Sequence, residues 1–186
     1  ESFMATHTHQ VVQTTDPKEL MWHFRQPYSR YFNHKYQRTG KLGESTHFTM
    51  EVIGYHHTIA ALSYVLRNAL HHGVVPIPYA YPHCSVNAIF SKEMGKFQKE
   101  NLLSERNYSQ YIGRRAEYPS NYRMSESGVF LRETVLDIPQ VENLFFSPRS
   151  FNYYMSRKSS EEWEAEQNKD GNNSLPINLS AIERGF

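Results

Sequence analysis

The segment from Ile59 to Val75 constrains the fold more than any other stretch of this chain, because it carries a clear helical period. Gly73 is suited to a C-terminal cap, and Pro76 and Pro78 prevent the helix from continuing. Apolar residues recur along the segment at steps of three and four positions, so they share one helix face that packs against a core: Ile59, Leu62, Val65, Leu66 and Ala69. We therefore expect one helix across the whole segment.

Another face of this predicted helix carries two side chains that could take part in a reaction. Tyr64 and Asn68 are four residues apart, so they are neighbours on the helix surface. A phenol and a carboxamide placed side by side could act as a nucleophile and a metal ligand. The interpretation of the whole chain depends on whether they do.

Composition limits the classes of protein that the chain can belong to. Its 186 residues suffice for one domain, or for a small domain with an appendage. No run approaches the roughly 18 apolar residues of a membrane helix, so we expect a soluble protein with no membrane partner. The single cysteine, Cys84, fits a reducing cytoplasm. The net charge of +1 permits nucleic acid as a partner but does not indicate it.

Residues 3–13 have the composition of a β-strand, with frequent Thr and Val and no Gly or Pro. Alternate residues of a strand share a face, so we expect the side chains of His7 and His9 to point the same way. Two imidazoles at this spacing can bind one divalent ion. The alternative, which spacing by itself favours, is a pair of half-exposed histidines on a polar face of the sheet.

A strong helix start comes next, with Asp16 at the N-cap, Pro17 at the first helical position and Glu19 at the third. We expect Pro27 to kink this helix rather than end it. Its helical stripe is expected to face the core and consists of Leu20, Met21, Phe24, Tyr28, Tyr31 and Phe32.

A polar loop with two glycines follows at residues 33–43. Its basic side chains are Lys35, Arg38 and Lys41. They could contact a phosphate backbone, or the loop could be a solvated turn, which its composition favours. Residues 47–53 then have the pattern of a second strand.

Residues 91–186 are expected to form a mostly helical extension. Residues 128–138 predict a strand or a short helix, 141–155 one or two short helices, and 161–167 a further helix. Arg and Tyr also interleave without helical order, and they could stack on the bases of a single strand or form an ordinary surface loop: Arg106, Tyr108, Tyr111, Arg114, Arg115 and Tyr118.

The order of these segments resembles the HUH single-tyrosine transposases, and most closely the branch associated with repetitive extragenic palindromes. Three parts carry the resemblance: His7-Thr8-His9 on a predicted strand, the Tyr-Phe-Asn…Arg-Thr-Gly-Lys loop, and Tyr64-Val-Leu-Arg-Asn68 followed by His-Gly-Val-Val-Pro. The match covers about residues 3–90. Ala69 stands after Asn68, where the family has proline.

The resemblance implies that His7, His9 and Asn68 bind a divalent metal ion, Mg or Mn, and that Tyr64 is the nucleophile. The ion would polarise an oxygen of the scissile phosphate, and the phenol would displace a 3′-hydroxyl and retain the 5′ end of the DNA. A 3′-hydroxyl can reverse this step and join strands. The expected DNA-binding residues are Lys35, Arg38, Lys41, Arg67, Arg114 and Arg115.

The implied fold class is α+β, with residues 1–90 forming an antiparallel, ferredoxin-like sheet on which helices pack. Residues 91–186 would form the helical extension, a candidate for DNA binding. The family fold has a strand, a helix and another strand before the histidines, and a sheet of two strands is too narrow to stand alone. We therefore expect either a missing upstream segment or a second subunit that completes the sheet, and we expect a homodimer.

Three functional hypotheses follow from these residues. The first is a metal-dependent enzyme that cleaves and rejoins single-stranded or hairpin DNA through a 5′-phosphotyrosine. The second is a non-catalytic protein on the same fold that binds a DNA sequence or hairpin. The third is a hydrolase or a structural zinc site built from the ten histidines, all of which lie at or before His83.

Overall fold

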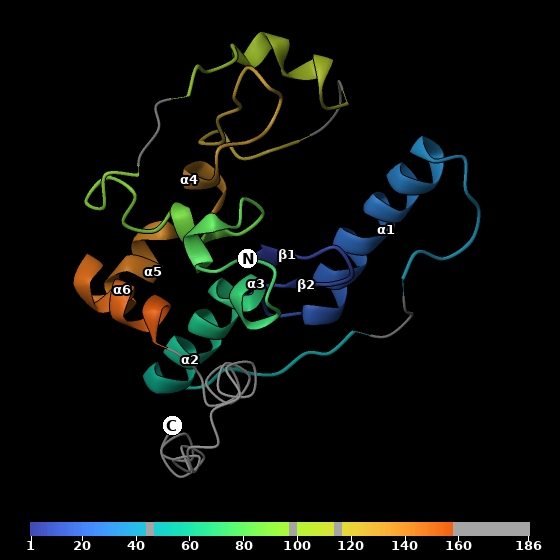
Figure 1. The fold of residues 1–186 in the computed structure, drawn as a ribbon. Coiled ribbons are helices and arrows are strands. Elements are labelled where there is room, and N and C mark those ends of the chain that lie inside the picture. The colour runs from blue at the N-terminus through green and yellow to red at the C-terminus, as the bar shows by residue number, and fades with distance from the viewer. Residues whose placement is uncertain (44–46, 97–99, 114–116, 158–186) are drawn as a thin grey trace. The chain divides into compact units, whose positions relative to one another are not determined.

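The computed structural model describes residues 1–43, 47–96, 100–113 and 117–157 (Figure 1). The chain divides into two compact units. Unit 1 consists of Glu1–Gln10 and the described residues of Gly54–Phe186, and unit 2 consists of Val11–Ile53. The sequence predicts a domain boundary at residue 90, and the residues directly on either side of this position both belong to unit 1.

Unit 1 begins with a small antiparallel sheet. Strand β1 (Ser2–Phe3) pairs with strand β2 (Thr8–His9), and Ser2 lies opposite His9. The turn between them is closed by the backbone N–H of Met4, which donates to the carbonyl of His7 at 2.8 Å. The prediction of one strand over residues 3–13 is therefore wrong. Thr and Val favour extended backbone in general, and they do not specify where the chain reverses.

A second segment lies along the other edge of β1. The N–H of Phe3 donates to the carbonyl of His83 at 2.9 Å, and Ser2 forms an isolated bridge with Cys84. The thiol of Cys84 is buried and donates to the carbonyl of Leu66 at 3.5 Å. Residues 83–85 thus connect the hairpin to the end of the central helix.

The predicted central helix is divided in two. Helix α2 spans Tyr55–Leu66 and helix α3 spans Asn68–His71, with Arg67 between them at φ −99° and ψ 4°. The prediction of one unbroken helix is wrong at this residue. The predicted end is confirmed: Gly73 has φ 66°, and the N–H of Val74 donates to Ala69, as in a Schellman motif. The predicted apolar stripe is buried, and its members are Ile59, Leu62, Val65, Leu66 and Ala69.

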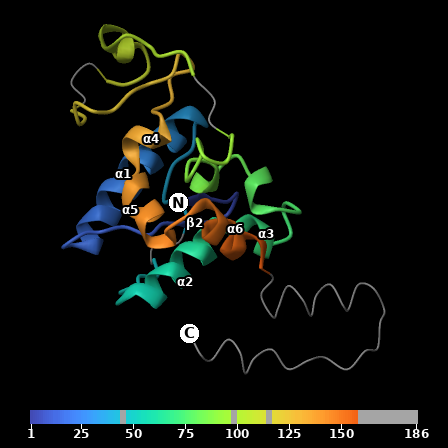
Figure 2. The ribbon, with the colours of Figure 1, turned by 90° about the vertical axis from the view of Figure 1, so that its left-hand side faces the viewer.

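The core of unit 1 forms where α2 meets two later helices, α5 (Ile138–Phe145) and α6 (Pro148–Ser156), as Figures 1 and 2 show. These two helices confirm the prediction of short helices over residues 141–155. Phe145, Phe151 and Met155 are completely buried there. Asp137 caps α5 by accepting from the N–H of Gln140, and Ser147 caps α6 by accepting from the N–H of Ser150.

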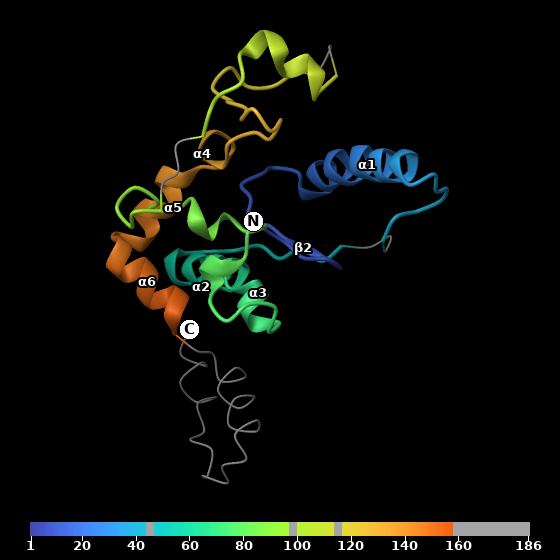
Figure 3. The same cartoon turned by 45° about the horizontal axis from the view of Figure 1, so that its top comes forward.

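The rest of unit 1 contains only short elements (Figure 3). Met124 and Phe130 form an isolated bridge before α4, so residues 128–138 contain a bridge, α4 and the start of α5. The helix expected at residues 161–167 lies outside the described residues. The short elements are the 3₁₀ helices η1 (Pro78–Ala80), η2 (Ser85–Asn87) and η3 (Glu105–Gln110), and helix α4 (Arg132–Val135).

In its described residues, 11–43 and 47–53, unit 2 contains one helix, α1 (Pro17–Lys35), and loops on both sides of it. Asp16 caps α1 as predicted, accepting from the N–H groups of Lys18 and Glu19, and the helix continues past Pro27. None of the residues of α1 is buried, so the prediction that its stripe forms core is wrong. Residues 47–53 have no regular structure, so the second predicted strand is also wrong.

The described part of the chain is thus mixed α and β, with one two-stranded antiparallel sheet. Among the described helices, none combines the length and apolar character needed to cross a membrane.

Candidate active site

Four residues predicted from the sequence meet within unit 1. Tyr64 lies near the end of α2 and Asn68 begins α3, while His7 and His9 come from the hairpin. The His7 and His9 rings lie 5.0 Å apart between centroids, and the His9 and Tyr64 rings lie 5.4 Å apart. Nδ2 of Asn68 lies 3.4 Å from Nε2 of His7. A phosphate oxygen could therefore reach the phenol and the imidazoles together.

Exposure differs across this group in a way that suits a reaction. The side chain of Tyr64 is exposed, with a relative accessibility of 48 %, so a large substrate can reach its hydroxyl. Asn68, one helical turn further on, is fully buried. Burial holds the amide of Asn68 in place, while the phenol of Tyr64 is accessible to a ligand.

Two more histidines join the cluster. The ring of His72 lies 5.2 Å from that of His7, and the ring of His71 lies 5.9 Å from that of Tyr64. Neither residue belongs to the site predicted from the sequence. The available signal was their spacing, since His72 follows Asn68 by four residues and therefore lies on the same helix face.

The charge state of His9 is set by its surroundings. Burial lowers the pKa of His9 below its ordinary value of 6.5, and the imidazoles of His7 and His72 lower it further. His9 is therefore neutral at neutral pH. The neutral imidazole is the form that carries a lone pair for a metal ion or a proton.

The side-chain amide of Asn68 contains a buried oxygen that could accept a hydrogen bond or bind a metal ion. Its Oδ1 has no hydrogen-bond partner in the part of the chain that the structure describes. Leaving a buried acceptor unpaired costs on the order of 1–3 kcal/mol, so such an atom calls for an explanation. A half turn of the amide exchanges Oδ1 and Nδ2 and places the oxygen beside His7.

The hydrogen bond on the far side of His7 is compatible with a free lone pair at Nε2. Nδ1 of His7 lies 2.9 Å from Oγ1 of Thr6. When Nδ1 carries the proton and donates it to Thr6, Nε2 presents its lone pair toward Asn68. Metal-binding histidines are usually held by such a hydrogen bond from the second ring nitrogen.

These donors fit the divalent ion that the resemblance implies. Two donor atoms about 2.1 Å from one ion lie about 3–4 Å apart, which is the separation of the Asn68 amide and His7 Nε2. No group of three or more His, Cys, Asp and Glu side chains in the described ranges is arranged to hold a metal ion. The candidate ligand set contains only two such side chains, His7 and His9, because its third donor is the amide oxygen of Asn68.

The other predicted residues are spread over the chain. Arg67 is buried at the junction of α2 and α3 in unit 1. Lys35 lies at the end of α1 in unit 2, and Arg38 and Lys41 lie in the loop after it. Arg114 and Arg115 lie outside the described residues.

Comparison with protein-family models, with curated proteins and with solved structures finds no match for this chain.

Proposed function

We propose that this protein is a metal-dependent enzyme that cleaves and rejoins single-stranded or hairpin DNA through a covalent phosphotyrosine at Tyr64. One observation carries the proposal: the exposed phenol of Tyr64 lies beside His9, in the same cluster as His7 and the buried amide of Asn68. The order of these residues along the chain, which resembles the HUH single-tyrosine transposases, supports it further.

The proposed reaction is a reversible exchange of two phosphate esters. The phenolic oxygen of Tyr64 attacks the scissile phosphorus, and the bond from phosphorus to the 3′-oxygen breaks. The 3′-oxygen leaves with a proton, and the 5′ end of the DNA stays on Tyr64. Because one ester replaces another, a 3′-hydroxyl can reverse the step without a nucleotide cofactor.

The phenol must lose its proton during the attack, and His71 is the proposed acceptor. A phenol ordinarily has a pKa of about 10, so it is protonated at neutral pH. The ring of His71 lies 5.9 Å from that of Tyr64 and belongs to the next helix, α3. A neutral imidazole at this position can take the proton directly or through one water molecule.

His7, His9 and Asn68 are the proposed ligands of a divalent ion, Mg or Mn. When bound, the ion supplies positive charge that polarises the scissile phosphate. Asn68 holds its amide in place because it is buried at the start of α3, and the two histidines are held by the hairpin. A second copy of the chain could add strands to the two-stranded sheet and build a ferredoxin-like fold, so we propose a homodimer. We also propose a cytoplasmic location, because the single cysteine, Cys84, is a free thiol.

The experiment is a search for a covalent adduct. The chain is incubated with Mn²⁺ and a pool of single-stranded and hairpin oligonucleotides labelled at the 3′ end, and then separated under denaturing conditions. We expect label to migrate with the protein in the wild type and in Tyr153→Phe, a variant at an exposed tyrosine of α6.

Tyr64→Phe should give no adduct, and an adduct in that variant would refute Tyr64 as the nucleophile. Hairpin binding without any adduct in the wild type would instead favour a non-catalytic DNA-binding protein.

A further inference from the structure

We infer that helix α1 and the loop after it form a binding surface for single-stranded nucleic acid, which we name the α1 surface: Tyr28, Tyr31, Phe32, Lys35, Tyr36 and Arg38. The inference deepens the proposed function, because it assigns the unpaired part of the DNA to unit 2. It rests on the proposed function only for the identity of the natural nucleic acid.

The charge of this segment favours a polyanion. Residues 20–43 contain five Lys and Arg residues and no Asp or Glu. The same 24 residues contain six aromatic side chains. Cations attract the phosphate backbone and aromatic faces stack on bases, which is the combination found in proteins that bind single strands.

Three of the four aromatic residues of the α1 surface are exposed to solvent, and Phe32 is partly exposed. Tyr28, Tyr31 and Tyr36 have relative accessibilities of 52, 58 and 55 %. Single exposed apolar residues are common, but several aromatic rings gathered on one helix and its end are not. Such a group indicates a surface that binds a ligand.

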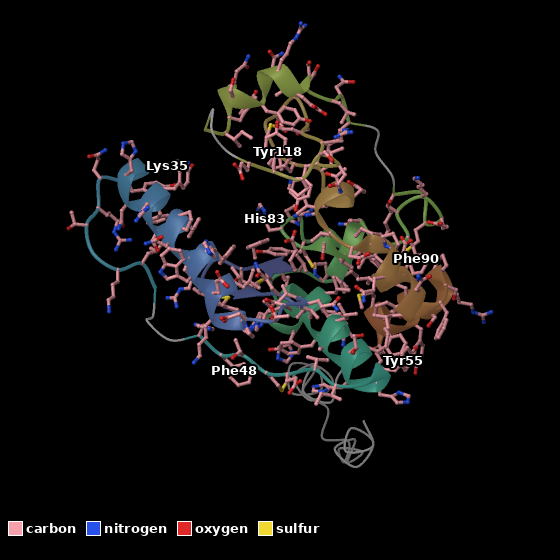
Figure 4. All side chains as sticks on the ribbon, turned by 180° about the vertical axis from the view of Figure 1, so that it is seen from behind. Lys35, Phe48, Tyr55, His83, Phe90 and Tyr118 are labelled. Atoms are coloured by element: carbon pink, nitrogen blue, oxygen red, sulfur yellow. The ribbon has the colours of Figure 1, made fainter. Side chains whose placement is uncertain are left out.

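The rings form a row along the helix. Tyr28, Phe32 and Tyr36 follow one another at four-residue steps, with centroid separations of 6.1 and 4.6 Å. The Lys35 ammonium, labelled in Figure 4, lies 5.5 Å from the centroid of Tyr31 and 5.6 Å from that of Tyr36. The Lys35 ammonium also donates to the hydroxyl of Tyr31 at 3.1 Å. A cation therefore lies beside two exposed rings, where the phosphates of a stacked strand would pass.

The loop after α1 holds further cations by specific hydrogen bonds. The side-chain amide of Asn33 donates to the carbonyl of Gly40 at 2.7 Å, and the N–H of Arg38 donates to the carbonyl of Asn33 at 2.8 Å. The guanidinium of Arg38 lies 5.6 Å from the ring centroid of Phe32. The loop thus extends the mixed aromatic and basic character of the helix.

A single strand explains this surface better than other occupants do. A duplex hides its base faces, so the exposed rings would have nothing to stack on. A membrane surface favours a broad aliphatic face, and Leu20 and Met21 are the only aliphatic side chains of α1. A protein partner bound through apolar contacts would not require cations beside the exposed rings.

The test is a binding titration of the full chain in EDTA, which prevents metal-dependent cleavage. The probes are fluorescent oligo-dT, oligo-rU, a DNA duplex and anionic phospholipid vesicles. We expect both single strands to bind more tightly than the duplex or the vesicles, and the affinity for oligo-dT to fall as salt rises. Equal or tighter binding of the duplex or of the vesicles would overturn the inference.

Substitutions separate stacking from charge. Tyr28→Ala and Tyr31→Ala should each weaken oligo-dT binding about ten-fold, whereas Tyr31→Phe, which keeps the ring, should retain it. Lys35→Gln should reduce the salt dependence. Tyr153→Ala, at an exposed tyrosine of unit 1, is the matched control and should have no effect. Unchanged binding in both α1 alanine variants would refute the α1 surface.

Two further outcomes are informative. If Tyr28→Ala dissociates an oligomer in sedimentation experiments without changing oligo-dT binding, the surface joins copies of the chain and the inference is wrong. The adduct experiment on Tyr64 is separate from this titration. Binding that depends on Tyr28 and Tyr31, in a protein that forms no adduct, would refute the enzyme and leave the α1 surface intact.

Discussion

The side-chain amide of Asn68 lies 3.4 Å from the imidazole of His7, although 61 residues separate them in the chain. This contact joins α3 to the N-terminal hairpin at the centre of the candidate site. Oδ1 of the same amide is buried without a hydrogen-bond partner in the described structure, so the residue has one polar atom to offer a ligand.

Asn68→Ala should weaken Mn²⁺ binding by at least about 10-fold. Loss of even an outer-shell partner of metal ligands typically costs 10- to 100-fold, and Asn68 is proposed as a direct ligand. Isothermal titration calorimetry without DNA measures this effect independently of activity. Asn152→Ala, which removes the acceptor of the Tyr79 hydroxyl in α6, is the control. Equal Mn²⁺ affinity in Asn68→Ala and the wild type would remove Asn68 from the ligand set.

His71→Ala should slow adduct formation by about 10²- to 10⁴-fold at neutral pH, because general-base catalysis contributes that much. The rate defect should shrink as pH approaches 10, where hydroxide can remove the phenolic proton, and added imidazole should restore part of the rate. The readout is the single-turnover rate of adduct formation.

His83→Ala is the matched control for this rate, since the His83 ring contacts Tyr81 and not Tyr64. If His71→Ala had the wild-type rate and pH profile, another group would have to accept the proton.

The sequence predicted the cluster in part, because helical spacing reports which residues share a face. It placed Tyr64 beside Asn68, and the stripe from Ile59 to Ala69 is buried as expected. The break at Arg67 carries no local signal, since arginine is a good helix former.

The long-range part of the site depends on tertiary hydrogen bonds. The hairpin reverses between Phe3 and Thr8 without Gly or Pro, and it is held by backbone bonds to residues 83–85. Neither feature has a sequence pattern that we could read. Residues 47–53 show the reverse case, because here the sequence predicts a strand that does not form. The segment has a strand-like pattern but no neighbouring strand to pair with among the described residues.

The metal-free protein should lose stability as pH falls below about 6.5. Burial, followed by the neighbouring imidazoles, lowers the pKa of His9 in the folded chain below the ordinary 6.5. The unfolded chain therefore takes up a proton at higher pH than the folded chain, and protonation favours unfolding. The contribution of His9 is complete above about pH 6.5 and is lost as pH decreases from 6.5 to the folded pKa. Urea unfolding in EDTA between pH 5 and 8 measures it.

His9→Gln should flatten this pH dependence, because glutamine does not titrate. His23→Gln alters an exposed histidine of α1 and should leave the dependence as it is in the wild type. A wild-type protein whose stability rises between pH 7 and pH 5 would contradict the assigned direction of the His9 shift.

Phe151→Ala should destabilise unit 1 by about 3–5 kcal/mol, since Phe151 is completely buried and its ring lies 5.0 Å from that of Phe145. Chemical denaturation measures the change. Tyr153→Ala, two residues further along α6 and exposed, should change stability by no more than about 0.5 kcal/mol. Because α6 packs against α2, the loss should also reach the helix that carries Tyr64. A cost below about 1 kcal/mol for Phe151→Ala would mean that α6 does not support α2, and the placement of Tyr64 would then need another cause.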